Sequence, residues 1–366
     1  MVGSHETGNE TYVKGLVSGL SQLSDDLDIY VYHVGSAWAA DASHIQFRSI
    51  GNASPWARLT FGLSTRAARD SLDVLHVTYT SPLWAPCPIV VTVHDISFVE
   101  HPDWFSRRDL RVLSTTVPMS IRKARRVITV SELCREQIMA HYRVPPEKVV
   151  AIPNAAGPAA MALSDEDARR ELAAMGLDSK RPYALAVGNL QPRKNLIRLI
   201  GAIRSVAAQG IDLDLLVVGP EHYRAEEVLG EAREAAERIK FTGYITDRQL
   251  AACYSCASVY AFPSLFEGFG IPLLEAMAHG VPVVCSKAGA FPEVCGDAAL
   301  YFDPLDVDSI ADALTRVVKD GALRLELIRK GRAREREFTW RRSAESTLAV
   351  YRQSARRTGA REAVGH

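Results

Sequence analysis

The sequence has few cysteines, no excess of either charge and no long hydrophobic run. Six cysteines in 366 residues are too few for a disulfide scaffold, so we expect a reducing, cytoplasmic compartment. The 43 Lys and Arg residues are balanced by 43 Asp and Glu residues, so the global positive charge typical of nucleic-acid-binding proteins is missing. The longest apolar runs, such as Leu213–Val218, are too short for a membrane span. The first 20 residues lack the pattern of a signal peptide, so we expect none.

What the sequence does contain is an alternation of short β-branched runs with helical periods, almost from end to end. The runs are apolar on consecutive residues, which is typical of parallel strands covered on both faces. This alternation predicts doubly wound α/β sheets, and the length favours two domains. The expected strands are Asp28–His33, Asp73–Val77, Ile89–Val93, Val127–Val130, Val149–Ile152, Tyr183–Val187, Leu213–Val218, Ile239–Thr242, Val259–Phe262 and Val283–Cys285. Helices are expected at Tyr12–Leu23, Glu132–His141, Leu196–Ala208, Pro272–His279 and Val307–Lys319.

The domain junction is expected in the segment 154–182, which contains a Gly-Pro pair and a polar run typical of a helix cap. We therefore predict one domain over residues 1–160 and a second over 161–339. Two such domains enclose a cleft, and ligands bind where the carboxyl ends of strands face it.

The beginning of the first domain is unusual. Only Met1 and Val2 precede the loop Gly3–Gly8, so no strand leads into the helix expected at Tyr12–Leu23. Either the sequence starts downstream of the true start, or this sheet lacks a strand that is usually central.

A glycine-rich loop with two glutamates lies in the stretch 263–280, directly after an expected strand. Gly268 and Gly270 leave backbone N–H groups uncovered just before a helix N-terminus, which favours an anion site. Glu267 and Glu275 flank that site. Carboxylates suit the hydroxyls of a ribose and a sugar better than they suit a phosphate. The alternative is a tight turn with a solvated Glu at each end.

A second loop, 188–195, also joins an expected strand to an expected helix. It places Arg193 and Lys194 at the helix entry, where two cations would neutralise a diphosphate and stabilise it as a leaving group without a metal. A solvated Arg-Lys pair is the alternative. No Gly-x-Gly-x-x-Gly follows a strand, which disfavours a nicotinamide-dependent dehydrogenase.

Together these stretches resemble retaining family 4 glycosyltransferases (group 1), which have the GT-B fold of two Rossmann-like domains facing a cleft. Glu267 and Glu275, with seven residues between them that include Gly-Phe-Gly-Ile-Pro, match the family's Glu-x7-Glu signature. The loop from Gly188 to Asn195 matches its diphosphate loop. Further matches are Val127–Ser131, Ile152–Asn154, Gly243–Ile245, Phe291–Val294 and Gly296–Ala298.

The resemblance implies a role for each matching residue. Arg193 and Lys194, in the loop that begins at Gly188, would hold the donor diphosphate. Glu275 would take the ribose hydroxyls, and Glu267 the hydroxyls of the transferred sugar.

Other matching positions imply further contacts with the donor. His94 falls where the family often has a histidine facing the donor sugar, although a structural histidine on a loop is the alternative. Backbone N–H groups of Phe269 and Gly270 would orient the sugar and phosphate. Backbone atoms of Tyr244 and Ile245 would contact the nucleobase. The N-terminal loop with Gly3 and Gly8 would lie near the phosphates.

The sequence departs from the family pattern at two further places. The usual Pro-Asn-Gly turn at the domain junction is Pro153-Asn154-Ala155, so a backbone that needs a positive φ would be strained or rebuilt. The glycine loop holds Gly3 and Gly8 rather than an adjacent pair.

The resemblance implies transfer of a hexose from a nucleotide sugar to a glycan or lipid-linked glycan, with retention and without a metal or other cofactor. The motifs 93–98 and 101–105 are similar to bacterial mannosyltransferases of polysaccharide assembly, which favours GDP-mannose; a UDP-hexose is the alternative donor. No well-placed second carboxylate is evident as a nucleophile, so front-face attack is implied.

The rival interpretation is a sugar-nucleotide-binding protein that has lost catalysis. The family's last helix, here 340–356, would pack back on the first domain.

The segment Ser106–Arg126 carries seven basic side chains and one acidic one. A solvated helix face is one interpretation. The other is a patch that rests on anionic lipid at the inner face of the membrane while the enzyme reaches a lipid-linked acceptor. Pro118 interrupts the segment, so any amphipathic helix there should be short.

Overall fold

The computed structural model describes residues 7–23, 27–34, 44–51, 62–178, 180–233 and 237–355. The first half of the chain forms α1 (Thr7–Ser21), β1 (Ile29–His33), β2 (Ile45–Ser49), α3 (Leu63–Arg69), β3 (Leu75–Thr78), β4 (Ile89–Thr92), α4 (Ser97–Glu100), α5 (Arg107–Lys123), β5 (Arg126–Thr129), α6 (Glu132–Tyr142) and β6 (Val149–Ala151). The second half forms α7 (Asp165–Ala174), β7 (Tyr183–Val187), α8 (Leu196–Ala208), β8 (Asp214–Val218), α9 (Ala225–Ala232), β9 (Ile239–Phe241), α10 (Asp247–Ser255), β10 (Val259–Phe262), α11 (Ile271–Ala278), β11 (Val283–Ser286), α12 (Phe291–Cys295), β12 (Ala299–Phe302), α13 (Val307–Lys319), α14 (Gly321–Glu335) and α15 (Trp340–Ser354).

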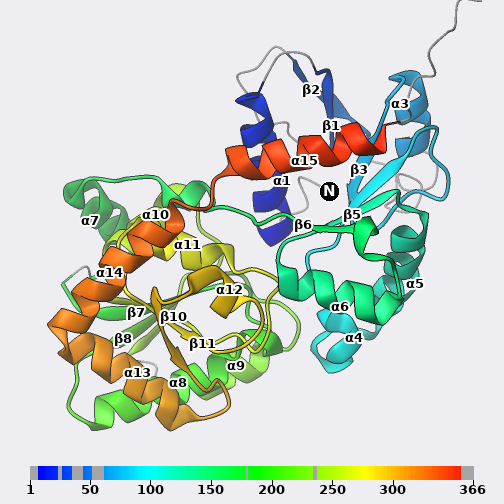
Figure 1. Cartoon of the computed structure of the whole chain (residues 1–366). Coiled ribbons are helices and arrows are strands. Elements are labelled where there is room, and N and C mark those ends of the chain that lie inside the picture. Colours follow the sequence, from blue (N-terminus) through cyan, green and yellow to red (C-terminus); the bar gives the residue numbers. More distant parts are fainter. Residues whose placement is uncertain are drawn as a thin grey trace, which may run out of the picture.

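These elements form two Rossmann-like domains of parallel strands flanked by helices, which confirms the fold class expected from the sequence (Figure 1). The second domain holds a six-stranded parallel sheet in the order β12-β11-β10-β7-β8-β9. β8 and β9 follow β7 on one side of it, and β10, β11 and β12 lie on its other side. The order of strands therefore reverses between β7 and β10, and such a switch point opens a crevice at the carboxyl ends of the strands.

The consecutive apolar residues of the second sheet are explained by two cores, one on each face. Leu215 and Val217 on β8 point into a core shared with α8, α9 and α13. Leu216 and Val218, the alternate residues, point into a core shared with α7, α10, α11 and α12. Because both faces are covered, neither set of side chains needs to be polar.

The strands of the first domain fall into two sheets rather than one. β3, β4, β5 and β6 form a four-stranded parallel sheet, while β1 pairs only with β2. Within the described residues, no strand precedes α1. β2 and β12 were not expected from the sequence. In β2 only Ile45 is buried, unlike the continuously apolar strands that the sequence pattern selected.

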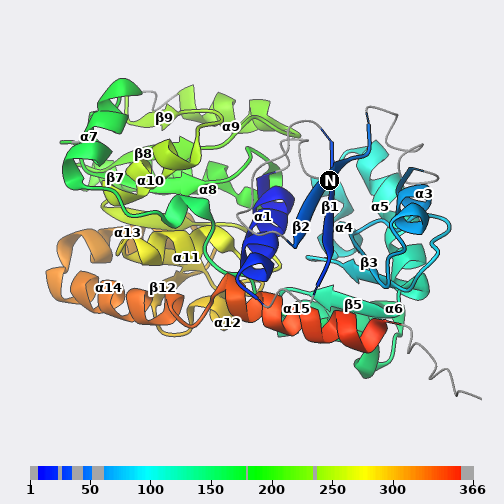
Figure 2. The ribbon, with the colours of Figure 1, turned by 90° about the horizontal axis from the view of Figure 1, so that it is seen from above.

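The last helix, α15, lies across the first domain beside α1, as both views show (Figures 1 and 2). The side chain of Trp340 at its start donates a hydrogen bond to the carbonyl of Ala156 (2.7 Å), and Ser343 donates one to the carbonyl of Pro153 (2.6 Å). Both carbonyls belong to the segment that joins the domains. Ala155 in this segment does not have a positive φ, so the junction is rebuilt rather than strained.

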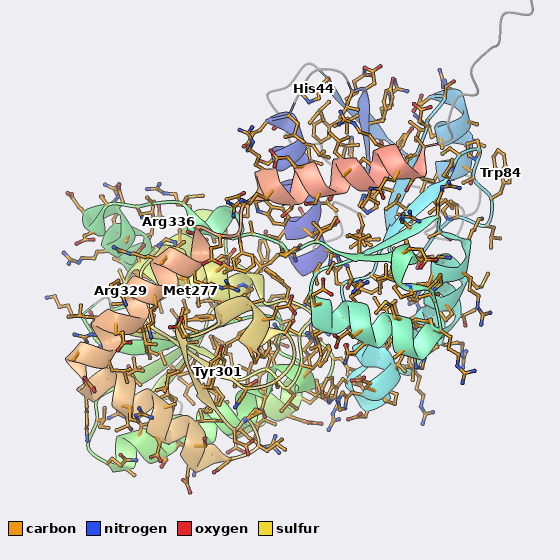
Figure 3. The ribbon with its side chains drawn as sticks, viewed as in Figure 1. His44, Trp84, Met277, Tyr301, Arg329 and Arg336 are labelled. Atoms are coloured by element: carbon orange, nitrogen blue, oxygen red, sulfur yellow. The ribbon has the colours of Figure 1, made fainter. Side chains whose placement is uncertain are left out.

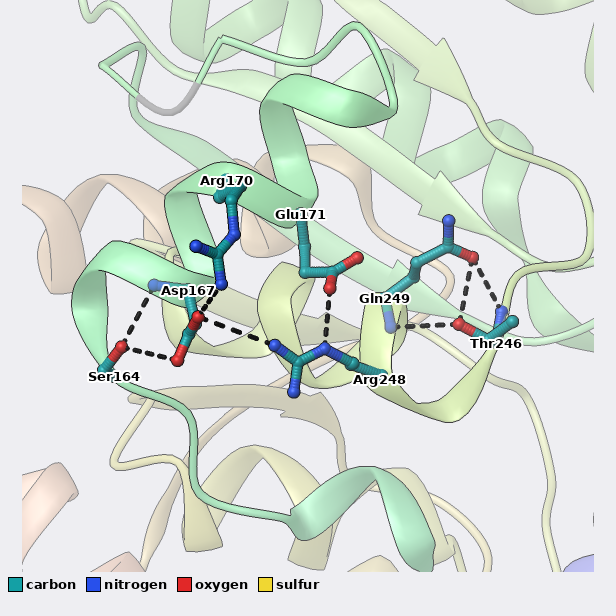
Figure 4. Close-up of polar contacts among 7 residues, drawn as sticks. All are labelled: Ser164, Asp167, Arg170, Glu171, Thr246, Arg248 and Gln249. Carbon is teal, nitrogen blue, oxygen red and sulfur yellow. Dashed lines mark hydrogen bonds and ion pairs between the residues drawn. The ribbon is translucent and has the colours of Figure 1, made fainter.

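The entry into the second domain is held by polar contacts between α7 and α10 (Figure 4). Arg248 on α10 contacts Glu171 (2.6 Å) and Asp167 (3.7 Å) on α7. The hydroxyl of Ser164 caps α7 by accepting from the backbone N–H of Asp167, and Thr246 caps α10 in a reciprocal pair with Gln249.

The expectation that Pro118 would break the helix was wrong, since α5 runs through it for 17 residues. Pro118 has no N–H to donate, but hydroxyl groups on the same helix bind nearby carbonyls. Thr115 donates to Arg111 (2.8 Å), and Ser120 donates to Thr116 (2.7 Å). None of the helices in the described ranges is both long and apolar enough to cross a membrane.

Candidate functional site

The two loops singled out in the sequence follow β7 and β10, the strands that flank the switch point. They are tied together, because the backbone N–H of Leu265 donates to the carbonyl of Arg193 (2.8 Å) and the side-chain amide of Asn195 donates to the carbonyl of Pro263 (3.1 Å). Asn195 also adopts a left-handed backbone conformation, which Asn tolerates better than most residues. A small cavity of about 10 Å³ lies there, lined by Gly188 and Lys194 among others.

Arg193, Lys194 and Glu267 form a buried charged cluster at this point. The Arg193 Nη1 lies 2.6 Å from Glu267 Oε2, and the Lys194 Nζ lies 2.5 Å from Glu267 Oε1. The three side chains are only 12% to 21% exposed. Ser264 donates a further hydrogen bond to Glu267 Oε1 (3.2 Å). Both oxygens of the carboxylate are therefore occupied, and two cations face the cleft with one paired anion.

The charges in this cluster support one another. Burial would raise the pKa of Glu267, but Arg193 and Lys194 outweigh burial and lower the pKa to about 2. Burial lowers the pKa of Lys194, and the Glu267 carboxylate opposes that shift. Glu267 is therefore ionised near pH 7, and it is a weak base.

Two glycines are needed for this arrangement. Gly188 has a φ of +144°, and a Cβ there would lie 2.6 Å from Lys194 Cε, so a side chain would push the lysine out of the cluster. A Cβ on Gly268 would lie 2.1 Å from the carbonyl oxygen of His94. The glycine-rich loop that contains Gly268 thus touches the first domain, and the contact joins the charged cluster to His94 across the cleft.

His94 lies at the carboxyl end of β4, between two tyrosine rings. The ring of Tyr12 on α1 meets it edge-on at 4.7 Å between centroids, and the ring of Tyr79 lies 5.6 Å away. Its Nε2 is buried and has no hydrogen-bond partner. Burial lowers the pKa of His94 to about 4, against the opposing effect of Asp95, so the imidazole is neutral near pH 7.

Asp95 is a site residue that the sequence analysis missed. Its Cβ lies beside Gly268, where an added Cβ would be 3.2 Å away. Ser97 fixes it by donating from both its backbone N–H (2.9 Å) and its hydroxyl (2.6 Å). Burial lowers the pKa of Arg193, whereas Glu267 and Asp95 together raise it, with a net rise. Its position next to His94 was the only signal in the sequence.

Glu275 lies in α11 and is 5% exposed. The hydroxyl of Tyr254 donates to Glu275 Oε2 (2.9 Å), and a Cβ on Gly157 in the interdomain segment would lie 2.4 Å from Oε1. Burial raises the pKa of Glu275 to about 7, although the hydrogen bond from Tyr254 opposes this. The second glutamate of the signature thus lies deeper than the first, against the junction between the domains.

Raising the pKa of Glu275 from its ordinary value near 4.5 predicts a specific pH dependence of stability. Between pH 4.5 and 7 the unfolded chain loses this proton first, so the free energy of unfolding should fall by about 3 kcal/mol over that range. Glu275→Gln should abolish this fall, so that the difference in melting temperature from the wild type grows up to pH 7.5. The exposed Glu221→Gln is the control. Parallel pH profiles for wild type and Glu275→Gln would contradict the prediction.

The remaining predicted residues are more scattered. Phe269 is buried against Phe338 (5.7 Å between ring centroids), and Gly270 has a φ of +99° just before α11. Tyr244 is 64% exposed after β9, and Ile245 beside it packs on the second-domain core. Gly8 lies in the first turn of α1 with open space around it, and Gly3 lies outside the described residues.

A further contact across the cleft involves Glu293 of the Phe-Pro-Glu-Val motif. Its carboxylate accepts hydrogen bonds from the backbone N–H groups of Glu132 (2.9 Å) and Leu133 (3.3 Å) at the start of α6. A carboxylate from the second domain thus caps a helix of the first, where the helix dipole favours negative charge. Sequence analysis had matched this motif to the family without a role.

Comparison with known proteins identifies the class to which this fold and site belong. The family model described as Glycosyltransferase Family 4 matches residues 7–158, and the one described as Glycosyl transferases group 1 matches residues 167–334. The chain belongs to this family and has its GT-B fold. It is therefore a glycosyltransferase, an enzyme that moves a sugar from a nucleotide-sugar donor to a glycan or lipid-linked acceptor.

Similar proteins include two bacterial mannosyltransferases. O-antigen chain mannosyltransferase B of Escherichia coli is 31% identical over 266 residues, 72% of this chain and 70% of that protein. O-antigen chain mannosyltransferase RfbU of Salmonella typhimurium is 30% identical over 228 residues, 62% of this chain and 60% of that protein. Among solved structures, sucrose-phosphate synthase from Thermosynechococcus elongatus superposes with a TM-score of 0.75 at 22% identity, covering 94% of this chain and 93% of that one.

Proposed function

We propose that the chain is a retaining hexosyltransferase that transfers mannose from GDP-mannose to a glycan or lipid-linked glycan. The observation that supports this most is the convergence of Arg193, Lys194 and Glu267 at the switch point of the second sheet. Two buried cations match the charge of a diphosphate. The mannose donor rests on the names of the relatives described above, and a UDP-hexose is the alternative.

The cluster supports leaving-group stabilisation without a metal. Arg193 and Lys194 would take up the negative charge that develops on the departing diphosphate, as a divalent cation does elsewhere. Glu267 would then turn one or both of its oxygens toward hydroxyls of the transferred sugar. The buried and unpartnered Nε2 of His94 is a polar atom that the donor sugar would satisfy.

We propose front-face substitution with retention. Glu267 is a poor nucleophile, because two cations hold it and lower its pKa. In the proposed step the bond from the sugar C1 to the phosphate oxygen breaks, and the acceptor oxygen bonds to C1 on the same face. The acceptor proton passes to the departing phosphate. Contacts across the cleft, such as Gly268 against His94, would exclude water and limit hydrolysis of the donor.

The test is to incubate the full chain with GDP-mannose or UDP-glucose and a panel of alkyl mannosides. ³¹P NMR follows the nucleotide released, and ¹H NMR follows the anomeric proton of the transferred sugar. Release of GDP with an α-linked product supports the proposal. Release of UDP alone would point to the alternative donor, an inverted product would contradict retention, and binding without turnover would indicate a binding protein that has lost catalysis.

We also propose that the segment Ser106–Arg126 contacts anionic lipid. Five of its arginines are exposed, and Met119 on α5 is 49% exposed. The adjoining loop presents Leu83 and Trp84, 68% and 57% exposed. Lys123 anchors that loop by donating to the carbonyl of Pro82 (2.7 Å). Apolar tips beside basic side chains are typical of proteins that rest on a membrane surface.

Neutralising this patch is expected to reduce binding to vesicles of phosphatidylglycerol and phosphatidylcholine by at least tenfold. The change is glutamine at five exposed arginines, and sedimentation with vesicles is the measurement. The control replaces three exposed arginines, two in α14 and one directly after it, and this helix lies far from Trp84 (Figure 3). Equal binding by the patch variant and the wild type would contradict the proposal. The five are Arg107, Arg108, Arg111, Arg122 and Arg125, and the three are Arg324, Arg329 and Arg336.

A further inference from the structure

A chain of hydrogen bonds crosses the first domain from the last helix to α1. The hydroxyl of Tyr351 on α15 lies 2.6 Å from His76 Nδ1 on β3. His76 Nε2 lies 2.7 Å from the hydroxyl of Thr92 on β4, and the hydroxyl of Tyr12 on α1 lies 2.9 Å from that same Thr92 oxygen. Four side chains from four elements, as much as 339 positions apart in the sequence, thus form one network.

This network is uncharged, and it is buried at the end that holds Thr92 and Tyr12. Thr92 is fully buried and Tyr12 is 5% exposed. Burial lowers the pKa of His76 to about 3 and raises the pKa of Tyr12 to about 12. A neutral imidazole has one donor and one acceptor nitrogen, so all three hydrogen bonds are made whichever direction the donors run. A buried polar network with every bond made is rigid, and it fixes the groups at its ends.

One end of the network is in contact with His94. Thr92 and His94 are two residues apart at the end of β4, and the Tyr12 ring meets the His94 ring edge-on at 4.7 Å and 79°. The hydroxyl bond to Thr92 prevents the Tyr12 ring from swinging away. The orientation of the imidazole, and hence of its unpartnered Nε2, therefore depends on where Tyr12 is held.

We propose that Tyr351 is a positioning residue for the transfer reaction, which it affects by fixing His94 through His76, Thr92 and Tyr12. The last helix of the chain thus completes the site as well as packing on the first domain. This inference rests on the proposed role of His94 toward the donor sugar. If it holds, the packing of α15 on the first domain affects the rate of transfer as well as the stability of the protein.

The test compares Tyr351→Phe, Tyr12→Phe and the double variant with the wild type in the full chain. Each single change removes one hydroxyl and keeps the ring. We expect each to lower kcat for transfer from GDP-mannose about tenfold and to leave the donor KM within about twofold, because the donor diphosphate is bound elsewhere. The kcat of the double variant should lie within about twofold of the kcat of the slower single variant, since both changes break the same network.

Val350→Ala is the matched control. Val350 is the neighbouring residue on α15, is 3% exposed and packs against Val90, Ile128 and Ile152 of the sheet. It should lower the melting temperature but leave kcat within about twofold. An equal loss of kcat in Val350→Ala, multiplicative effects in the double variant, or an unchanged kcat in Tyr351→Phe would overturn the proposal.

A second measurement separates this inference from the proposed function. The imidazole Cε1 proton of His94, followed by NMR without any substrate, should shift in Tyr351→Phe and stay unchanged in Val350→Ala. His94→Ala assigns the signal and tests the role of His94 in transfer. If His94→Ala keeps full activity, that role is wrong, and the NMR comparison still decides whether Tyr351 positions the ring.

Discussion

Lys194→Ala is expected to lower kcat for sugar transfer about 100- to 1000-fold, the usual cost of removing a buried group that stabilises charge developing in the transition state. The Lys194 ammonium lies 2.5 Å from Glu267, and the lysine side chain is 12% exposed, so its charge acts from a largely buried position. Glu267 remains paired with Arg193 at 2.6 Å, so the protein should stay folded. The measurement is steady-state release of nucleotide diphosphate from the donor.

Lys287→Ala is the control for this change. Lys287 follows β11, the strand next to β10, at the same edge of the sheet, but it is exposed. It should retain kcat within about twofold. A loss of less than threefold in Lys194→Ala, or equal losses in the two variants, would show that the charged cluster does not stabilise the leaving group.

Gly19→Ala is expected to destabilise the protein by about 3 kcal/mol, at the upper end of the cost of overpacking a core. Gly19 lies where α1 meets α15. A Cβ there would be 2.1 Å from the carbonyl oxygen of Trp340 and 2.9 Å from Ala344 Cβ. A backbone carbonyl cannot rotate away as a side chain can, so the two helices must separate. The melting temperature of the first unfolding transition should fall by about 5 to 10 °C in differential scanning calorimetry.

Gly8→Ala on the same helix is the matched control, because a Cβ there meets nothing within 4 Å. This change should leave the melting temperature unchanged or raise it slightly, since alanine favours a helix more than glycine does. A Gly19→Ala protein as stable as Gly8→Ala would mean that α1 and α15 do not pack as closely as these distances require.

The features that could be predicted from the sequence are local ones. The strands β7, β8 and β10 are apolar on consecutive residues, and the loops after β7 and β10 carry glycines with charged neighbours. Arg193, Lys194 and Glu267 could therefore be proposed as partners, since the carboxyl ends of parallel strands meet at one edge. The structure brings these three together and places His94 against Gly268.

The features that were missed depend on contacts between residues far apart in the chain. Asp95 belongs to the site because it lies beside Gly268, which follows it by more than 170 residues, and Glu293 caps α6 from the other domain. The hydrogen bonds of Tyr351 leave no trace in local periodicity. The expectation for Pro118 was wrong for another reason. Propensity predicts a break there, but the tertiary packing of α5, which buries Val117 and Ile121, outweighs it.

The site of the donor diphosphate is tested most directly by the thermal stability of the purified chain with GDP, UDP and ADP, each with and without its sugar, in wild type and in Lys194→Ala. We predict that GDP and GDP-mannose selectively raise the melting temperature of the wild type by several degrees, and that Lys194→Ala loses the response. An equal response in Lys194→Ala, or no response of the wild type to any of these nucleotides, would contradict a donor site at the Arg193–Lys194–Glu267 cluster.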